Sequence, residues 1–447
     1  MDKLIINGGK RLMGTISVSG AKNVALKTLV AACLTDEEVI IENIPLISDF
    51  MVMVDIVKEL GGKVKTKDHK VSIKVKKIKK ERIELDKAAK VRSSAMFVAP
   101  LLARLKKAII PNPGGCRIGA RPIDRTIKGL KEMGFDAEYR SEDGYFYLKE
   151  RSKIQNKGRV VNYRFEKNTH TGTETLIMTA VLFNGKVVLE NAAEEPEVDE
   201  LIALLNKMGA KIKRIDAGTI AINGVRKLHG ARFTIGPDRN EIVTFAIGAL
   251  VTKGDIFVKN ANRVDLKAFL EKLKESGAGI EIKNNGIRFF YDKPLKSINI
   301  ETRSYPGFMT DWQGPWTVLM TRANGTSVIH ETVYENRFGY VSELKKMGAD
   351  VMFFNPKVEN PSKVYNFNLS DNIPSYFHAL KVYGPTKLHD AVVWMSDLRA
   401  GATLVLAALV AQGQTTIFGV EHLDRGYEKF DKRLKSLGGS IKRVKDE

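Results

Sequence analysis

One pattern of sequence recurs six times along the chain, with a period of roughly 70 residues. Each copy has a polar cluster, an apolar helix-like run, a short β-branched strand, an amphipathic helix and a glycine stop. The six stops are Leu60-Gly61-Gly62, Met133-Gly134-Phe135, Met208-Gly209-Ala210, Ser276-Gly277-Ala278, Met347-Gly348-Ala349 and Leu437-Gly438-Gly439. Such a period predicts one supersecondary unit that is used six times.

The first helix of each copy is apolar on nearly every side, whereas a surface helix carries a single apolar stripe. We therefore expect these six helices to lie inside, at residues 23–33, 92–105, 173–183, 240–251, 313–321 and 400–411. The strands that follow are expected at residues 38–43, 107–111, 186–190, 255–259, 326–331 and 415–418. Amphipathic second helices, such as residues 201–208 and 269–275, should cover the outside.

A chain of 447 residues is too long for one ordinary core. Six units most simply form two domains of three units each, with a layered α/β (α+β) architecture. We expect residues 21–235 to form the domain that carries a cysteine loop. The second domain is expected to be discontinuous, with residues 1–20 plus 236–447. The strand at residues 1–6 has no partner in its own copy and should join the C-terminal half.

The segment at residues 355–393 is longer than the corresponding segments of the other copies and is rich in Asn, Pro, Tyr and His. Insertions favour loops, so we expect an elaborated hairpin or surface excursion there. The residue pattern suggests no chemical role for it.

The formal net charge of +20 fits either a polyanion partner or a lysine-rich surface. We favour the surface, because no basic stripe is interleaved with aromatic residues, and we expect no nucleic acid partner. No apolar run reaches the roughly 18 residues of a membrane span, and no signal peptide is evident. With only two cysteines, a reducing cytoplasm is expected. We also expect a monomer.

The two cysteines lie in very different surroundings. Cys116 lies within residues 111–124, which contain three glycines, three prolines and the arginines Arg117 and Arg121. Nearby positive charge favours the thiolate, so a reactive thiol is expected at Cys116. Cys33 lies in an apolar run, so we expect it to have a structural role.

Polar clusters stand at the starts of the six inner helices, at residues 19–23, 92–94, 169–174, 238–241, 310–313 and 396–399. Helix N-termini are natural anion sites, but each cluster could also be an ordinary helix cap. The caps that we expect are Ser19, Asp238 and Ser396.

The helix dipole is positive at a helix start and disfavours basic side chains there. Because Lys22, Arg92 and Arg399 are basic and stand at helix starts, we expect a bound anion near them. No metal-ligand spacing and no dinucleotide fingerprint is found, so we expect no metal and no cofactor.

Seven runs of residues together resemble a known family. They are Ser19-Gly20-Ala21-Lys22-Asn23, Pro113-Gly114-Gly115-Cys116 with Gly119-Ala120-Arg121-Pro122, Glu190-Asn191-Ala192-Ala193, Thr310-Asp311, Glu331-Thr332-Val333-Tyr334-Glu335-Asn336-Arg337-Phe338, Asp397-Leu398-Arg399-Ala400 and Asp424-Arg425-Gly426-Tyr427. In this order they resemble UDP-N-acetylglucosamine enolpyruvyl transferase (1-carboxyvinyltransferase), of the EPSP synthase superfamily.

The resemblance implies two inverse α/β-barrel-like domains, each of three repeated units with inner helices, sheets and outer helices. It also implies transfer of the enolpyruvyl group of phosphoenolpyruvate to the 3′-hydroxyl of UDP-N-acetylglucosamine, with release of phosphate. That reaction is the first committed step of peptidoglycan synthesis.

The resemblance further implies a role for individual residues. Cys116 would be the general acid and Asp311 the base. Lys22, Arg121, Arg399 and Arg425 would hold the phosphate and carboxylate, and Asn23 would orient the intermediate. The other substrate-binding residues implied are Arg92, Pro122, Ile123, Asp124, Arg125, Lys167, Asn168, Thr169, His170, Val333 and Asp397.

The chain departs from the family pattern in four places, one of which is the unexpected length of the segment at residues 355–393. Residues 169–174 replace a Ser-Val-Gly-Ala-Thr stretch, Trp312 replaces a Met, and Arg125-Thr126 replaces Leu-His.

Three alternatives stay open. A shikimate-pathway enolpyruvyl transferase shares the six-unit architecture, but normally lacks the Gly-Gly-Cys loop. A nucleic-acid-binding or RNA-end-processing protein of related repeat fold is suggested by the charge. A catalytically silent homologue is disfavoured by the retained Lys22, Cys116, Asp311 and Arg425.

Overall fold

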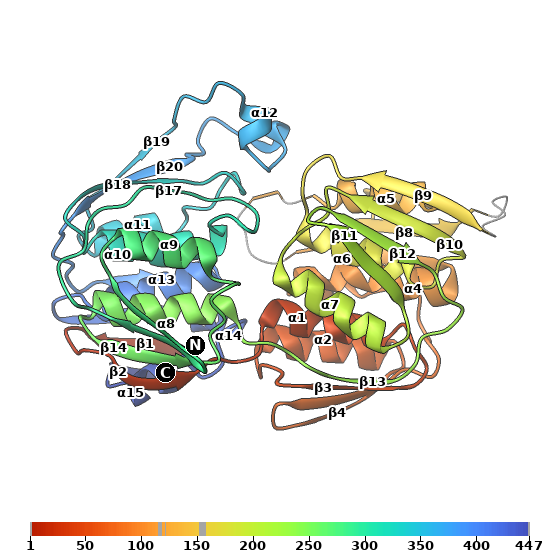
Figure 1. Ribbon diagram of the computed structural model, residues 1–447, viewed down its shortest axis with the longest axis horizontal. Coiled ribbons are helices and arrows are strands. Elements are labelled where there is room, and N and C mark those ends of the chain that lie inside the picture. Colours follow the sequence, from red (N-terminus) through yellow and green to blue (C-terminus); the bar gives the residue numbers. More distant parts are fainter. Residues whose placement is uncertain (1, 115–118, 121, 152–157, 446–447) are drawn as a thin grey trace. The chain divides into compact units, whose positions relative to one another are not determined.

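Two structural units make up the described part of the chain (Figure 1). The computed structural model describes residues 2–114, 119–120, 122–151 and 158–445. What we call the N-terminal unit contains the described residues of 20–114 and 122–236. The C-terminal unit contains residues 2–19, 119–120 and 237–445.

The N-terminal unit contains three copies of the repeat. Its elements are α1 (Lys22–Ala32), β3 (Glu38–Glu42), α2 (Ser48–Glu59), β4 (Lys63–Lys67), β5 (Lys70–Lys74), α3 (Leu85–Ala88), η1 (Arg92–Phe97), α4 (Val98–Leu105), β6 (Lys107–Pro111), α5 (Asp124–Glu132), β7 (Phe135–Arg140), β8 (Tyr145–Glu150), β9 (Arg159–Arg164), α6 (His170–Ala180), β10 (Gly185–Glu190), α7 (Pro196–Lys207), β11 (Lys211–Asp216), β12 (Thr219–Asn223) and β13 (Ala231–Thr234).

The C-terminal unit contains the other three copies and two strands from the chain start. Its elements are β1 (Asp2–Asn7), β2 (Met13–Ser17), α8 (Arg239–Val251), β14 (Asp255–Lys259), α9 (Lys267–Glu275), β15 (Gly279–Lys283), β16 (Gly286–Phe290), β17 (Ile300–Glu301), η2 (Thr310–Trp312), α10 (Gln313–Met320), β18 (Gly325–His330), α11 (Val341–Lys346), β19 (Val351–Phe354), α12 (Pro361–Val364), η3 (Leu369–Asp371), β20 (Ala379–Gly384), β21 (Val392–Trp394), α13 (Leu398–Ala408), β22 (Gln414–Phe418), α14 (Val420–Asp424), α15 (Phe430–Ser436) and β23 (Ser440–Lys445).

The same sheet topology recurs in every copy. In the first copy, β3 pairs antiparallel with β5 of its own hairpin and parallel with β13 on its other side. The described residues form six sheets, with the orders β13-β3-β5-β4, β6-β8-β7, β11-β12-β10-β9, β15-β16-β14-β2, β17-β18-β20-β19 and β21-β22-β1-β23. The sheet β6-β8-β7 has only three strands among the described residues. At the position that a fourth strand occupies in the other five sheets, it has an isolated parallel bridge between Arg82 and Ile109. The predicted sixfold repeat is therefore confirmed.

The first helix of each copy lies inside its unit, as predicted. Helices α8, α10 and α13 pack against one another (Figure 1). All 13 residues of α8 are buried. Helix α4 likewise packs against α6 and α1. Four of these helices begin earlier than predicted, α1 and α8 by one residue and α6 and α13 by three and two residues. The sequence between residues 92 and 105 forms a 3₁₀ turn before its α-helix.

The glycine stops end the outer helices in the left-handed conformation. The first glycine after each of these helices has a φ between 82° and 97°, a range that side chains other than glycine rarely adopt. After α2, for example, the Gly61 N–H donates to the Lys58 carbonyl and the Gly62 N–H to the Val57 carbonyl. These two bonds satisfy carbonyls at the helix end and turn the chain into the hairpin.

The N-terminal strand completes the last sheet of the C-terminal unit, as its missing partner predicted. Strand β1 lies between β22 and β23 and pairs antiparallel with both. Leu4 and Ile6 of this strand are fully buried.

The excursion predicted at residues 355–393 is shorter in the structure. Only residues 355–378, between β19 and β20, leave the sheet, and they contain the short helices α12 and η3 (Figure 1). Residues 379–384 form strand β20, which lies between β18 and β19. Ala379, Leu380 and Val382 are fully buried there, so their burial against the unit's core outweighs the polar composition around them.

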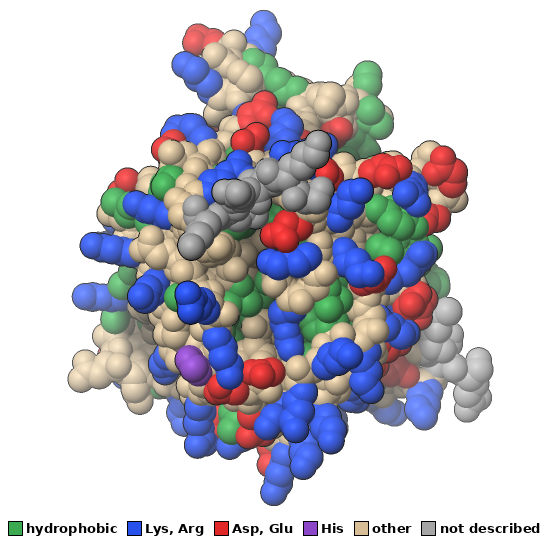
Figure 2. Space-filling view, turned by 90° about the vertical axis from the view of Figure 1, so that its right-hand side faces the viewer, with side chains coloured by type: hydrophobic (Ala, Val, Ile, Leu, Met, Phe, Trp, Pro, Cys, Tyr) green, Lys and Arg blue, Asp and Glu red, His purple; other side chains and the backbone are tan. Residues whose placement is uncertain are grey.

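The surface carries its charge in a dispersed form. On the face shown in Figure 2, Lys and Arg side chains are spread among Asp and Glu side chains and form no single stripe. None of the helices in the described part of the chain has the length and hydropathy that a bilayer-spanning helix requires.

Trp316 of α10 offers a test of the inner-helix packing. It is fully buried, and its ring centroid lies 5.4 Å from that of Phe308 and 6.1 Å from that of Phe269. We expect Trp316→Ala to lower the free energy of unfolding by about 3–5 kcal/mol through cavity formation. Urea denaturation followed by circular dichroism measures this loss.

A matched control is Trp394→Ala, because Trp394 is 55% exposed. The Trp316 indole N–H has no hydrogen-bond partner among the described residues, so Trp316→Phe should cost less than Trp316→Ala. Equal losses in Trp316→Ala and Trp394→Ala would contradict an inner position for α10.

Candidate active site

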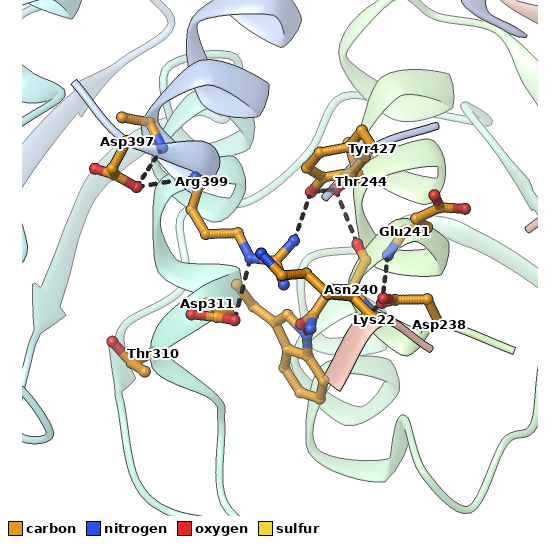
Figure 3. A network of polar contacts seen from close by, with 12 residues as sticks. Lys22, Asp238, Asn240, Glu241, Thr244, Thr310, Asp311, Asp397, Arg399 and Tyr427 are labelled. Carbon is orange, nitrogen blue, oxygen red and sulfur yellow. Dashed lines mark hydrogen bonds and ion pairs between the residues drawn. The ribbon is translucent and has the colours of Figure 1, made fainter. Parts of the chain in front are cut away.

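The Asp311 carboxylate contacts two arginines of the C-terminal unit, and Figure 3 shows the contact with Arg399. Its Oδ2 accepts a hydrogen bond from Arg399 Nε at 3.1 Å, and its Oδ1 accepts one from Arg337 Nη2 at 3.1 Å. Asp311 stands just before α10 and Arg399 at the start of α13, so the packing of these two helices brings the charges together.

These charges fix the ionisation of Asp311. Burial alone would raise the pKa of this carboxyl group, but Arg399 and Arg337 outweigh burial and lower the pKa to about 2. Asp311 is therefore a carboxylate at neutral pH. Its basicity is low for as long as both arginines contact it.

A chain of hydrogen bonds continues from Arg399 to the third inner helix (Figure 3). Arg399 Nη1 donates to the Tyr427 hydroxyl at 3.1 Å, and that hydroxyl lies 2.8 Å from Thr244 Oγ1 of α8. On the same helix, Asn240 Oδ1 accepts the Trp312 indole N–H at 3.0 Å. The starts of α8, α10 and α13 thus form one polar cluster.

Two of the three predicted helix caps were wrong. Asp238 caps α8, since its carboxylate accepts the N–H groups of Asn240 and Glu241. Helix α13 is capped by Asp397, which accepts the N–H groups of Arg399 and Ala400, and not by Ser396. Helix α1 has no side-chain cap, and Ser19 donates its N–H to Glu241. An ionised carboxylate is the stronger acceptor, which explains the preference for Asp397 over Ser396.

The turn after β18 is organised around the buried Glu331. Its carboxylate accepts the N–H groups of Val333 and Tyr334 at 2.8 and 3.0 Å, and the Thr310 hydroxyl at 2.8 Å. Thr310 precedes Asp311, so one buried acid links the turn that carries Val333 to the Asp311 cluster.

Glu335, in the same turn, contacts the described part of the glycine-rich loop. Its carboxylate accepts the N–H of Ala120. A Cβ added at Gly119 would lie 2.5 Å from the same carboxylate, so this close approach requires glycine.

In the N-terminal unit, Lys22 at the start of α1 is buried and paired. Its Nζ lies 2.7 Å from Asp49 Oδ2, at the start of α2. A bound anion is therefore not required to compensate the charge of Lys22 or of Arg399, since each contacts a carboxylate. Asn23, the next residue of α1, is half-buried.

A second buried ion cluster lies between α1 and α6. Glu174 Oε1 is 2.7 Å from Lys27 Nζ and 3.2 Å from His170 Nε2, and the Glu174 side chain is fully buried. Burial acts to lower the pKa of His170, but Glu174 outweighs it and the pKa lies above its ordinary value. The His170 ring is therefore protonated more readily than an ordinary histidine, and its Nε2 also lies 3.0 Å from Lys27 Nζ.

The other predicted residues of the N-terminal unit line several helix starts and turns. Arg92 Nη1 donates to the Pro113 carbonyl at 3.5 Å, and the Arg125 carbonyl accepts the Tyr163 hydroxyl. Partial burial and the charge of Arg125 lower the pKa of Lys167.

The remaining predicted residues occupy simpler positions. Asn168 Nδ2 donates to the Ala192 carbonyl, and Thr169 caps α6 by accepting the Gly172 N–H. Pro122 is exposed, and Ile123 precedes α5. Asp124 begins α5, and its buried Oδ1 has no hydrogen-bond partner among the described residues.

Three predicted residues remain to be placed. Arg425 directly follows α14. Cys116 and Arg121 lie outside the described residues.

Sequence reasoning did not single out Lys27 or Asp49. Lys27 is the one charged residue between Val24 and Leu34, and Glu174 also lies in a helix that is otherwise uncharged beyond its first residue. Two opposite charges inside two predicted inner helices were a signal for a buried pair. Asp49 gave no such signal, because it stands at a helix start where an acid is ordinary.

The chain matches known proteins over nearly its whole length. The family EPSP synthase (3-phosphoshikimate 1-carboxyvinyltransferase) matches residues 6–434. The fold is similar to that of the enolpyruvyl transferase NikO from Streptomyces tendae, with a TM-score of 0.84 and 22% identity over 100% of this chain and 99% of that one. EPSP synthase from Acinetobacter baumannii gives a TM-score of 0.71 and 17% identity over 99% and 100%. These likenesses confirm the predicted fold class.

Curated relatives are closer in sequence. UDP-N-acetylglucosamine 1-carboxyvinyltransferase from Koribacter versatilis is 42% identical over 99% of this chain and 97% of the relative. The protein of the same name from Desulfatibacillum aliphaticivorans is 40% identical over the full length of both. The chain is therefore a transferase of the EPSP synthase family, and within it belongs to the UDP-N-acetylglucosamine 1-carboxyvinyltransferases.

Proposed function

We propose that this chain transfers the enolpyruvyl group of phosphoenolpyruvate to the 3′-hydroxyl of UDP-N-acetylglucosamine, releases phosphate and so commits material to peptidoglycan. Relatives of that name at 40–42% identity over nearly the full length support the choice of substrates. The observation that carries the chemistry is the Asp311 carboxylate between Arg337 and Arg399.

In this proposal, Asp311 accepts the proton of the sugar 3′-hydroxyl while the 3′-oxygen of the sugar forms a bond to C2 of phosphoenolpyruvate. Cys116 donates a proton to C3, which gives a tetrahedral intermediate. Loss of a proton from C3 and departure of phosphate from C2 then restore the double bond. Lys22, Arg121, Arg399 and Arg425 hold the phosphate and carboxylate groups, and Asn23 orients the intermediate.

The ion pairs of Asp311 suggest how its basicity is controlled. With Arg399 on one oxygen and Arg337 on the other, the carboxylate is a poor proton acceptor. An anionic substrate group that engages Arg399 would weaken its pull on Asp311 and raise the pKa of that carboxyl group. The base would thus strengthen when phosphoenolpyruvate is bound.

The N-terminal unit supplies the groups proposed for the nucleotide sugar. Arg92, Arg125, Lys167 and His170 provide positive charge for a diphosphate, which is doubly anionic. Asp124, Asn168 and Thr169 provide hydrogen-bonding groups beside them. From the C-terminal unit, Val333 and Asp397 complete the proposed set.

Phosphate release with phosphoenolpyruvate and either UDP-N-acetylglucosamine or shikimate 3-phosphate tests the proposal. We expect turnover only with the nucleotide sugar. Asp311→Asn should lower kcat about 10²–10⁴-fold, because the amide cannot accept the hydroxyl proton.

Asp68→Asn is the matched control, since it makes the same chemical change at an exposed hairpin turn. It should leave kcat unchanged. Turnover of shikimate 3-phosphate alone would overturn the substrate assignment, and an active Asp311→Asn variant would remove Asp311 from the role of base.

The pH dependence of kcat/KM tests the control of Asp311. Arg337 stabilises the carboxylate, so Arg337→Met should raise the pKa of Asp311 from about 2 and move the acid limb to higher pH. Arg337→Lys keeps the charge and should move the limb less. A profile that is identical in all three proteins would contradict this electrostatic account.

The two cysteines give an internal test of the general acid. Burial raises the pKa of the Cys33 thiol to about 12, so this thiol should not react at neutral pH. An epoxide phosphonate that mimics phosphoenolpyruvate should add to Cys116 alone, as intact-mass measurement would reveal. Cys33→Ala should keep the single adduct and Cys116→Ser should lose it. An adduct that persists in Cys116→Ser would refute the assignment.

A further inference from the structure

The extension at residues 355–378 continues the sheet beside the Glu331 turn. The ladder between β18 and β20 ends at the pair His330 and Ala379. One step beyond it, the Glu331 N–H donates to the His378 carbonyl at 2.7 Å. The Asn366 N–H, from the middle of the extension, donates to the Thr332 carbonyl at 2.8 Å. The extension therefore holds the backbone of Glu331 and Thr332, the two residues that precede Val333.

An aromatic cluster anchors the extension at this place. Tyr365, Phe367 and His378 are each no more than 6% exposed, and their ring centroids lie 4.9–5.2 Å apart. The Tyr365 hydroxyl lies 3.3 Å from His330 Nε2, at the end of β18. The extension thus has a small core of its own, fixed to the strand that precedes the turn.

The extension is also closed on itself by hydrogen bonds. Asn355 Oδ1 accepts the His378 N–H at 2.8 Å, and Asn355 Nδ2 donates to the Tyr376 carbonyl at 3.2 Å. His378 Nε2 lies 3.1 Å from Asn372 Oδ1. These bonds join the two ends of the extension, so its contacts with Glu331 and Thr332 come from an ordered segment.

A third contact reaches the far end of the turn. The Phe377 ring of the extension stacks on Phe353 of β19 at 5.2 Å, and Phe353 lies 6.3 Å from Phe338. The turn at residues 331–338 is therefore supported at its start by hydrogen bonds and at its end by ring contacts.

We propose that the extension is a positioning element for the nucleotide sugar, which acts by fixing the turn that carries Val333. This inference rests on the proposed function, in which Val333 contacts UDP-N-acetylglucosamine. Loss of the support should weaken binding of that substrate more than binding of phosphoenolpyruvate, because the arginines proposed for the latter do not belong to this turn.

The Asn366 N–H allows a sharp test. Asn366→Pro removes the donor to Thr332, since proline has no N–H. Tyr365 has a ψ of 131°, an extended conformation that a residue before proline prefers. A proline at position 366 therefore causes no clash with the backbone of Tyr365. Asn366→Ala, the matched control, loses the side chain but keeps the N–H. Steady-state kinetics gives both KM values, and calorimetry gives the Kd of UDP-N-acetylglucosamine.

We expect Asn366→Pro to raise the KM and Kd for UDP-N-acetylglucosamine about tenfold, the effect of one lost hydrogen bond. The KM for phosphoenolpyruvate should stay within about twofold, and each value for Asn366→Pro is compared with that for Asn366→Ala, which lacks the same side chain but keeps the N–H. Replacement of residues 356–377 by an Asn-Gly turn should cause a larger rise of the same kind. Circular dichroism establishes that each variant is folded.

Unchanged KM for UDP-N-acetylglucosamine in both Asn366→Pro and the shortened protein would overturn the inference. Equal rises in the KM values of the two substrates would also overturn it. A wild type that does not turn over the nucleotide sugar would instead refute the proposed function, so the two failures are distinguishable.

Discussion

The rest of the structure depends on the burial of helices on every side. All residues of α8, α10 and α13 are buried, and most residues of α1 and α6 are, whereas α4 buries five of its eight residues. Such a helix can present polar groups to solvent or to a ligand only at its ends, where N–H groups lack partners within the helix. The starts of the inner helices are therefore where charged side chains gather. The position of the candidate site follows from this constraint before any chemistry is considered.

In the clusters described above, each buried lysine or arginine contacts a carboxylate. Lys22 contacts Asp49, Lys27 contacts Glu174, and Arg399 contacts Asp311. Loss of one partner from such a pair typically costs 3–5 kcal/mol, because the other charge is left unpaired in a poor solvent. The free protein thus keeps its cations in place with its own carboxylates. An anionic ligand then competes with a carboxylate of the protein for a cation that is already in place. The ligand therefore does not have to order a mobile side chain.

The repeat made much of the fold predictable. Strands β6 and β14 have the bounds predicted from the sequence, since their β-branched runs are flanked by helix ends and turns. The site was predictable mainly through family motifs, which named Asp311 and Arg399 as candidates, whereas Arg337 lay within one of the motifs and was assigned no role. Partners distant in sequence were not predictable, as Lys22 and Asp49 illustrate. The choice of Asp397 over Ser396 as a cap also depends on geometry that two adjacent hydrogen-bonding residues do not reveal. The support that Asn366 gives to Thr332 uses a backbone N–H, which leaves no trace in residue type.

The central position of β1 has a consequence for how the protein is made. Leu4 pairs with Ile417 on one side and with Arg443 on the other, so one strand synthesised first waits for two synthesised last. Contacts across such separations slow folding, and domains generally form as their residues leave the ribosome. Residues 20–236 can complete their three sheets during translation, while the C-terminal unit has to hold an unpaired apolar strand until β22 and β23 emerge. The nascent chain therefore carries an exposed strand edge for most of its synthesis, which is the period when chaperones would be needed most.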